Sequence, residues 1–302
     1  MVQGILQDMS SDSHIFDRSG IAALSDLENG AWRELFALLE KAQEDFRLKE
    51  ASFRSAGYKW PADALHAWSR VWEYPYVYHH LKEWRGLLPE GAAPRVLDMG
   101  SGVTFFPFAV ARLGCHVTCA DIDPVCLEDL GRAIGLLPQS PGSVDVLLTD
   151  GRLLPFDSDS LDAIYCISVL EHVPDFEHAV AGMARALRPG GMLLLTVDVD
   201  LKDPEDIDRH KRLGAVLNDY FLYAAADRTV HPSDMLTMNR GPYPAKLREG
   251  GRLAAYAVKH HVLKALTGEK KQLGLEHLEL AVQGFCLRKP HSDGRRGVYS
   301  EA

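Results

Sequence analysis

Between residues 95 and 200, short runs rich in apolar and β-branched residues alternate with helix-like patterns. Short apolar runs bounded by turn residues predict strands, whereas apolar residues spaced three and four apart predict helices. The predicted strands are Arg95–Met99, His116–Asp121, Val144–Thr149, Leu161–Ile167 and Met192–Val199, and the predicted helices are Phe105–Leu113, Pro124–Ile134 and Phe176–Leu187. This alternation is typical of an α/β fold with a doubly wound parallel sheet.

The two flanks of this region follow other patterns. Residues 1–90 predict a helical N-terminal extension, because apolar residues between 21 and 48 recur at helical spacing, as an amphipathic helix or helical pair requires. Residues 91–302 would form the main domain. Within it, a mostly helical insertion would follow the fifth strand, at about residues 201–275. His277–Leu287 is a plausible last strand.

An aromatic-rich stretch, residues 58–84, lies just before the first predicted strand. Two interpretations stay open. It closes as a lid over a bound ligand, with residues 86–94 as the hinge, or Trp68, Trp72 and Tyr76 form one helix stripe packed on the sheet.

The glycine loop Asp98-Met99-Gly100-Ser101-Gly102 follows the first strand and indicates a ligand site at the carboxyl edge of the sheet. A dinucleotide fingerprint requires Gly or Ala where Phe105 stands, so nicotinamide binding is disfavoured. Asp98 can hold a cationic amino group instead.

Later strand ends carry further polar candidates. Asp121 closes the second strand and can accept both hydroxyls of a ribose, with Asp123 as the alternative and Ile122 between them. Asp150 and Gly151 follow the third strand and can meet an adenine ring. Ser168, after the fourth strand, faces the reacting end of the ligand.

Together these motifs resemble class I methyltransferases that depend on S-adenosylmethionine (SAM), especially the small-molecule group related to ubiquinone and menaquinone methyltransferases. The resemblance rests on Val96–Gly102, Asp121, Asp150 with Leu154-Pro155-Phe156, Leu161-Asp162, Leu170–Val173 and Leu187–Gly191, about a third of the chain. It implies a Rossmann-like seven-stranded sheet with an antiparallel last strand, and SAM as cofactor. The methionine end would lie on Asp98, Gly100 and Gly102, the ribose on Asp121 and the adenine on Asp150.

Candidates for the chemistry of transfer are fewer. Arg70 could meet the methionine carboxylate, and His172 is the best-placed general base, although a purely structural role for Glu171-His172 is an equal alternative. His231 is a weaker candidate. No metal is expected, because Ser168 stands where some quinone O-methyltransferases have a Glu ligand.

Composition and charge narrow the function. Residues 91–200 carry 6 Lys+Arg against 15 Asp+Glu, which argues against a nucleic-acid surface. The sequence has neither a signal-peptide pattern nor an apolar run of the roughly 18 residues that span a membrane, so a cytoplasmic enzyme without membrane contact is expected. The five cysteines are interpreted as buried free thiols.

We therefore expect methyl transfer to oxygen, nitrogen or carbon of a small-molecule acceptor. A methyltransferase acting on protein or RNA, and a non-catalytic SAM-binding partner, are the alternatives.

Overall fold

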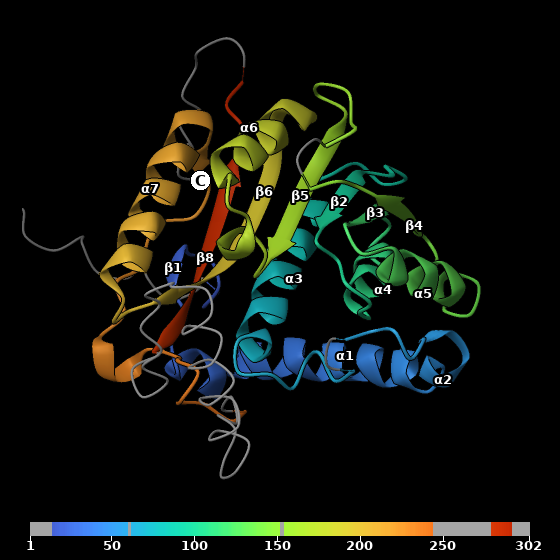
Figure 1. Ribbon diagram of the computed structural model, residues 1–302, viewed down its shortest axis with the longest axis horizontal. Helices are drawn as coiled ribbons and strands as arrows, with labels where there is room; N and C mark the ends of the chain where they lie inside the picture. The colour runs from blue at the N-terminus through green and yellow to red at the C-terminus, as the bar shows by residue number, and fades with distance from the viewer. Residues whose placement is uncertain (1–13, 60–61, 152–153, 244–278, 292–302) are drawn as a thin grey trace, which may run out of the picture.

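The computed structural model describes residues 14–59, 62–151, 154–243 and 279–291. Its sheet is built from strands β2 (Arg95–Met99), β3 (His116–Asp121), β4 (Ser143–Leu148), β5 (Leu161–Ile167), β6 (Leu187–Asp200) and β8 (Leu280–Arg288). They follow the order β8-β6-β5-β2-β3-β4, with β8 antiparallel to β6 and the others mutually parallel (Figure 1). The predicted doubly wound sheet with an antiparallel last strand is confirmed.

Alternate residues along the central strands supply two separate cores. In β6, Met192 and Leu194 belong to one buried cluster, while Leu193 and Leu195 belong to the other. Helices α6 (Phe176–Ala186) and α7 (Pro204–Tyr220) cover the second cluster. Helices α3 (Arg70–Gly86), α4 (Phe106–Ala111) and α5 (Pro124–Ile134) cover the first. Two faces covered by helices explain why these strands are apolar almost throughout.

The free edge of β8 is shared by two short strands. β1 (Gly20–Ile21) pairs antiparallel with β8 at Gln283 and Gly284, and β7 (Leu222–Tyr223) pairs with it at Leu287 and Arg288. Among the described residues the sheet therefore has eight strands rather than the seven implied by the resemblance. Part of the N-terminal extension, expected to be helical, is a strand because β8 offers it an unpaired edge.

The helical prediction for the extension otherwise holds. Helix α1 (Gly30–Arg47) begins where the Asn29 side chain accepts a hydrogen bond from the backbone N–H of Ala31 at 2.9 Å. A 3₁₀ turn, η1 (Ser25–Glu28), precedes it, and the short helix α2 (Glu50–Phe53) follows. The boundary at residue 90 stays a prediction, since buried residues of the extension and of the sheet share one core cluster.

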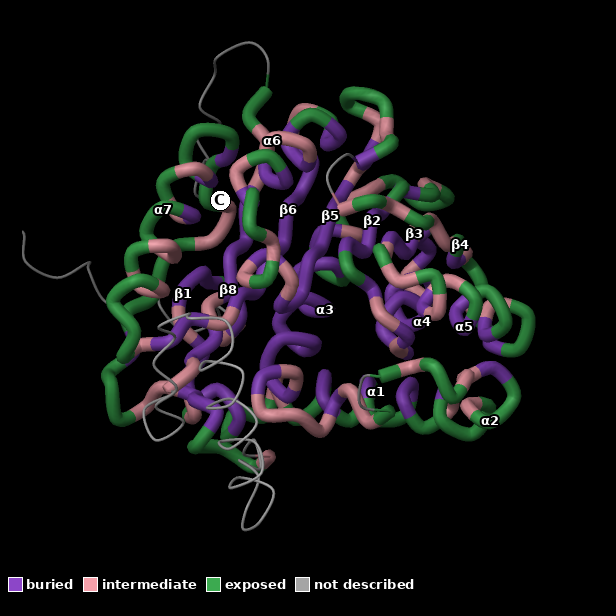
Figure 2. Tube along the Cα trace, viewed as in Figure 1, coloured by how far each residue is buried: buried purple, intermediate pink, exposed green. Residues whose placement is uncertain are grey.

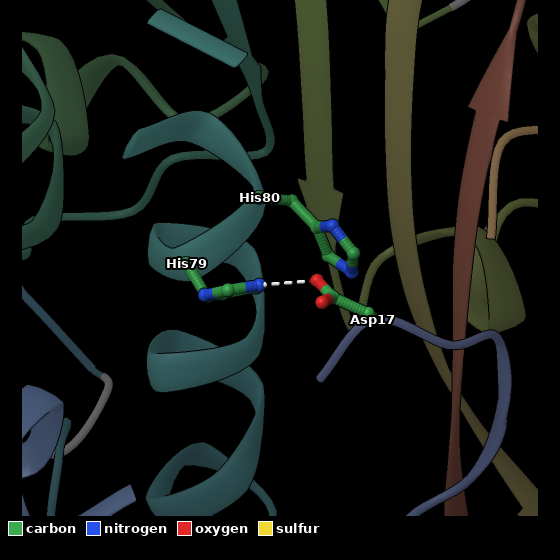
Figure 3. A group of neighbouring side chains, drawn as sticks. All are labelled: Asp17, His79 and His80. Atoms are coloured by element: carbon green, nitrogen blue, oxygen red, sulfur yellow. Dashed lines mark hydrogen bonds and ion pairs between the residues drawn. The ribbon is translucent and has the colours of Figure 1, made fainter. Parts of the chain in front are cut away.

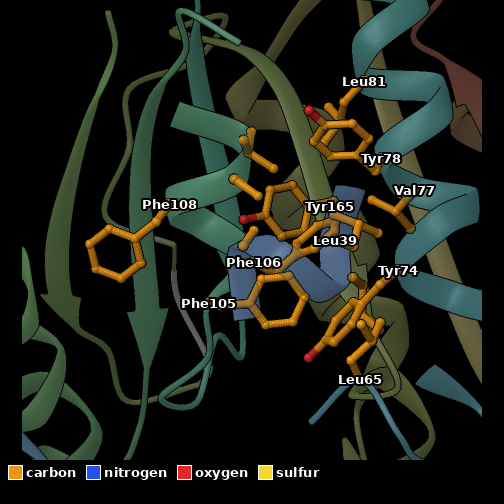
Figure 4. Close-up of a cluster of buried hydrophobic side chains, with 14 of the residues drawn as sticks. Leu39, Leu65, Tyr74, Val77, Tyr78, Leu81, Phe105, Phe106, Phe108 and Tyr165 are labelled. Carbon is orange, nitrogen blue, oxygen red and sulfur yellow. The ribbon is translucent and has the colours of Figure 1, made fainter. Parts of the chain in front are cut away.

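Helix α3 is buried along nearly its whole length (Figure 2). Trp72 and Tyr76 are fully buried and pack against Gly284 of β8. On another side, Tyr74, Val77 and Tyr78 face the aromatic cluster of Phe105, Phe106 and Tyr165 (Figure 4). Trp72 and Tyr76 therefore pack on the sheet as the second interpretation predicted, whereas Trp68 lies before the helix. Closure of residues 58–84 as a lid stays a prediction.

Beyond β6, helix α7 matches the predicted helical insertion. Residues 221–243 are less helical than predicted, because they contain only β7 and the three-residue turn η3 (Pro232–Asp234). The rest of the insertion, 244–275, lies outside the described residues. In the part of the chain that the structure describes, no helix is long and apolar enough to cross a membrane.

Replacing Gly284 with Ala should destabilise the protein by about 1–3 kcal/mol, the usual cost of overpacking a core. A Cβ at this position would lie 2.7 Å from Cε1 of Tyr76 and 2.9 Å from Cη2 of Trp72. Denaturant unfolding measures the difference. The control is Gly131→Ala in α5, where an added Cβ meets nothing within 4 Å and stability should hold or rise. Equal stability of the two variants would contradict the packing of α3 on β8.

Candidate functional site

The glycine loop lies at the carboxyl end of β2 and holds a conformation that glycine favours. Gly100 has φ +74° and Gly102 has φ +54°, both in the left-handed region. A Cβ on Gly100 would also lie 2.5 Å from Cγ2 of Val169, the residue that follows Ser168 after β5. Gly100 therefore allows the loop and the end of β5 to approach each other closely.

Asp121, at the end of β3, is tied directly to this loop. Its Oδ2 accepts a hydrogen bond from the backbone N–H of Gly102 at 2.9 Å, and its Oδ1 accepts one from Asp123 N–H at 2.9 Å. Each carboxylate oxygen retains a second lone pair, so two ligand hydroxyls can still be accepted. Asp123 caps α5 by accepting from Val125 N–H at 2.9 Å. This arrangement favours Asp121 as the ligand group and Asp123 as the helix cap.

Ile122, Asp150 and Gly151 lie together beside this carboxylate. The Ile122 side chain is unusually exposed for an isoleucine, at 66%, and a Cβ on Gly151 would lie 3.1 Å from its Cγ2. Gly151 has φ +73° and its N–H donates to Thr149 Oγ1 at 3.2 Å. An exposed apolar side chain, with the exposed Asp150 next to it, offers a flat ring both a stacking surface and an acceptor.

Asp98 is buried below the loop, with 5% of its surface exposed. Burial raises the pKa of its carboxyl to about 8, and the charge of Asp121 adds to the increase. The acid is therefore largely protonated at neutral pH in the free protein. A cation placed near it would favour the ionised form.

Arg70 and Ser168, both predicted from the sequence, meet in a buried polar network. The Arg70 guanidinium donates to Ser168 Oγ at 2.7 Å and forms an ion pair with Glu73. Ser168 Oγ donates to Glu73 Oε1 at 2.6 Å, and Thr196 Oγ1 donates to the same oxygen at 2.5 Å. Ser168 has φ +48°, an unusual backbone conformation for a non-glycine residue.

Sequence reasoning missed Glu73, the fully buried centre of this network. Its one local signal was its position three residues after Arg70, on the same face of a helix. Its other partners are 95 and 123 residues away along the chain. A buried carboxylate needs such partners, since an unpaired one would cost several kcal/mol (about 3–5).

Two more acids lie where β5 and β6 end. The backbone N–H of Asp198 donates to Glu171 Oε1 at 3.3 Å. Burial raises the pKa of Glu171 to about 7 and that of Asp198 to about 8, the latter helped by repulsion from Glu73 and Glu171. Both acids are thus substantially protonated near neutral pH.

The two candidate bases lie in different places. His172 ends the turn η2 (Leu170–His172), and its side chain is exposed on one side. The buried side of the ring and the charges of Arg209 and Arg70 lower the pKa of the imidazole. His172 is therefore neutral and able to accept a proton. His231 caps η3 instead, with Nδ1 2.7 Å from Ser233 Oγ. His172 thus lies four residues after Ser168 and within the influence of the Arg70 charge, whereas the hydrogen bonds of His231 are made within its own turn.

The segment before α3 covers the glycine loop. Tyr58 Oη accepts a hydrogen bond from Val103 N–H at 3.2 Å, and a Cβ on Gly102 would lie 3.4 Å from that oxygen. Arg54 lies over the Tyr58 ring, 4.2 Å from its centroid, and donates to the Val103 carbonyl at 3.2 Å. Tyr58, at the start of the aromatic-rich stretch, therefore contacts the predicted site at the glycine loop.

The cysteines take no part in this site. All five, at positions 115, 119, 126, 166 and 286, are free and buried, as the sequence predicted.

Part of this chain is similar to known proteins. Residues 97–195 match the family model described as a methyltransferase domain. Ubiquinone biosynthesis O-methyltransferase of Xanthomonas oryzae is 38% identical over 106 residues, 35% of this chain and 43% of that protein. Its counterpart from Xylella fastidiosa is 39% identical over 103 residues, 34% of this chain and 41% of that protein. The match thus spans less than half the length of these curated relatives.

Among solved structures, the [4+2]-cyclase SpnF has a TM-score of 0.50 at 18% identity, and the match covers 90% of this chain and 99% of SpnF. A likeness at this identity establishes the fold alone. The methyltransferase family match and the ubiquinone relatives confirm the resemblance seen in the sequence, for the part of the chain that contains the glycine loop, Asp121 and Glu171.

Replacing Asp121 with Asn should weaken SAM binding roughly 10- to 100-fold, because a charge-assisted hydrogen bond is worth about 1.5–3 kcal/mol. Asn keeps one oxygen, which can accept from the backbone N–H of either Gly102 or Asp123, so the fold should persist. Calorimetric titration with SAM measures the affinity. Asp123→Asn, which preserves a helix cap, is the matched control and should bind SAM as the unmodified chain does. If Asp123→Asn weakens SAM binding and Asp121→Asn does not, Asp123 rather than Asp121 is the residue that binds the ribose.

Proposed function

We propose that this chain, which carries a class I SAM-dependent methyltransferase domain, transfers the methyl group of SAM to a small-molecule acceptor. The observation that carries the proposal is the convergence of Gly102, Asp121 and the Ile122–Gly151 pair at one edge of the sheet. The ligand class follows from the chemistry of these residues. The Asp121 carboxylate can accept hydrogen bonds from two adjacent hydroxyls, and the exposed Ile122 beside it offers an apolar surface for a flat ring, as an adenosyl group requires.

The methionine end of SAM would lie between the glycine loop and the start of α3. Asp98 provides the negative charge for the ammonium group. Arg70 provides positive charge for the carboxylate, and its ion pair with Glu73 holds the guanidinium at the end of β5. Opposite charges at the two ends of a short group fix its direction as well as its position.

The acceptor would lie beyond Ser168, over the ends of β5 and β6. SAM supplies a methyl group on a positively charged sulfonium, which the acceptor takes by in-line displacement. The chain's own contribution is to align the acceptor and exclude water, with Tyr58 and the segment around it as the cover. Where the acceptor atom is a hydroxyl oxygen, neutral His172 takes its proton.

An oxygen acceptor is the first choice, because the curated relatives are named as O-methyltransferases. Nitrogen and carbon acceptors follow. The part of the insertion that includes α7, with Arg209 and His210 lining a small cavity against Glu171 and Asp198, would contribute to acceptor recognition. The acidic domain disfavours RNA as the substrate. The buried free thiols suit a reducing compartment, so we place the reaction in the cytoplasm.

The test is a product assay with methyl-labelled SAM and a panel of phenols, catechols, amines and carbon acids. We expect labelled product with at least one class. For an oxygen acceptor, His172→Ala should lower kcat by about 10²–10⁴, the usual contribution of a general base. His178→Ala, an exposed histidine on α6, is the control and should leave kcat unchanged.

Other outcomes would redirect the proposal. SAM binding without turnover on any small molecule, protein or RNA would identify a non-catalytic SAM-binding protein. An unchanged kcat in His172→Ala would assign Glu171-His172 a structural role.

SAM binding should also release a proton from Asp98. Its pKa of about 8 in the free chain falls when an ammonium group lies beside it, so affinity should rise as pH increases from about 6 to 8. Above about pH 8 the ligand's own α-amino group loses its charge and the gain ends. Calorimetry at pH 7 in two buffers of different ionisation enthalpy counts the protons released. Asp98→Asn, of equal size, should lower the number of protons released; a buffer-independent enthalpy in the unmodified chain would show that Asp98 is already ionised.

A further inference from the structure

A second cluster of chemically capable side chains lies on α3, away from the candidate site. Asp17, His79 and His80 gather where the N-terminal segment crosses this helix (Figure 3). His79 is nine residues after Arg70, which places it about 14 Å further along the helix axis. The cluster is therefore separate from the groups assigned to SAM and its acceptor.

The potential ligand atoms of this cluster converge. Asp17 Oδ1 lies 2.7 Å from His79 Nε2, and one donor atom from each of the three residues lies within 4.8 Å of the others. In Figure 3 the rings of His79 and His80 both approach the Asp17 carboxylate. In a tetrahedral zinc site, ligands about 2.0–2.1 Å from the ion lie about 3.3 Å apart, so small side-chain rotations suffice to admit an ion.

His80 is the member that the protein alone leaves unexplained. Its side chain is buried, with 6% of its surface exposed, yet its Nε2 has no hydrogen-bond partner. Leaving a buried polar atom unpaired costs about 1–3 kcal/mol. Figure 3 shows this ring turned toward the carboxylate of Asp17, so an ion at the centre of the cluster would give Nε2 the partner it lacks.

The side chains are held in place before any ion binds. The His80 ring packs edge-on against Tyr76 at a centroid distance of 4.7 Å, and His79 stacks on His14 at 3.8 Å. The second oxygen of Asp17, Oδ2, accepts from His14 N–H at 2.9 Å, which leaves Oδ1 directed at the histidines. Such support of the ligands strengthens metal binding.

We propose that Asp17, His79 and His80 bind a zinc ion. Two imidazole nitrogens and one carboxylate oxygen are a ligand set that zinc prefers, and three protein ligands leave a fourth position for water. The Asp17 side chain is 48% exposed, which gives an ion access from solvent. These three ligands could not be recognised from the sequence, because Asp17 is 62 residues before His79.

The ion would fasten the N-terminal segment to α3. Asp17 lies three residues before β1, which pairs with the edge of β8, so a bond between Asp17 and α3 also holds β1 on the sheet. The role we infer is structural, and its first readout is stability rather than turnover.

The experiment uses the full chain stripped with a chelator and titrated with Zn²⁺ by calorimetry. We expect one ion per chain and a higher melting temperature, because a ligand that binds only the folded state stabilises it. Co²⁺ serves as a coloured substitute, whose visible absorption reports nitrogen and oxygen coordination. This readout is independent of methyl transfer.

Two variants test the assignment. Asp17→Asn keeps a hydrogen-bond acceptor for His79 but removes the anionic ligand. Because the Asp17 side chain is half-exposed, we expect this variant to stay folded. His80→Leu removes the buried ligand. Each should lower zinc affinity at least about tenfold, the lower limit seen when even a supporting residue is lost.

The matched control is His66→Gln. His66 also contacts two carboxylates, but Asp63 lies at its Nδ1 and Glu40 at its Nε2, so these groups cannot converge on one ion. Zinc affinity should be unchanged in this variant. The proposal is overturned if the stripped chain binds no zinc, or if Asp17→Asn binds zinc as tightly as the unmodified chain does.

Discussion

The burial of α3 is the constraint on which the rest of the structure depends. A helix covered on all sides must be apolar or must find a partner for each polar group. α3 contains both kinds of residue. Trp72 Nε1 donates to Asp26 at 2.7 Å, and Tyr76 Oη donates to the Arg18 carbonyl at 2.9 Å. The N-terminal segment therefore packs where it can provide acceptors for the polar groups of α3. The same requirement brings Asp17 to His79.

This constraint also connects the core to the candidate site. Glu73 is a charge without access to water, and its hydrogen bonds come from Arg70 on its own helix and from the ends of β5 and β6. The groups that satisfy Glu73 are thus the groups that surround the predicted methionine end. Because removing either partner of a buried ion pair leaves the other charge uncompensated, Arg70 and Glu73 hold each other in place. A ligand carboxylate at Arg70 would find a guanidinium with little freedom left to lose.

The sequence predicted those parts of the molecule that are specified locally. The strands of the central sheet and the glycine loop are determined by residues that are close together in the sequence. Strands β2, β3 and β5 accordingly begin and end where the apolar runs do. Asp121 could be found because strand ends meet at one edge of a parallel sheet. Partners far apart in sequence could not: β1 pairs with β8, and Glu73 with Ser168, through contacts that no local period encodes. The bulky Phe105 and Phe106, which follow the glycine loop, pack against Tyr74 in the core.

The distribution of acids suggests how the proposed reaction favours turnover. Asp98 is buried, and Glu171 and Asp198 are half-buried, all near the carboxyl ends of the parallel strands; loss of hydration raises the pKa of each to between about 7 and about 8. Such groups ionise at little cost when a cation arrives, and they take up protons again when it leaves. SAM carries a sulfonium charge that its demethylated product lacks. On the proposed function, Asp98 would pair with the ammonium group, which the product keeps, whereas Glu171 and Asp198 would lose the attraction of the sulfonium charge together with the methyl group. Asp98 would therefore serve to bind SAM, and Glu171 and Asp198 would favour release of the product.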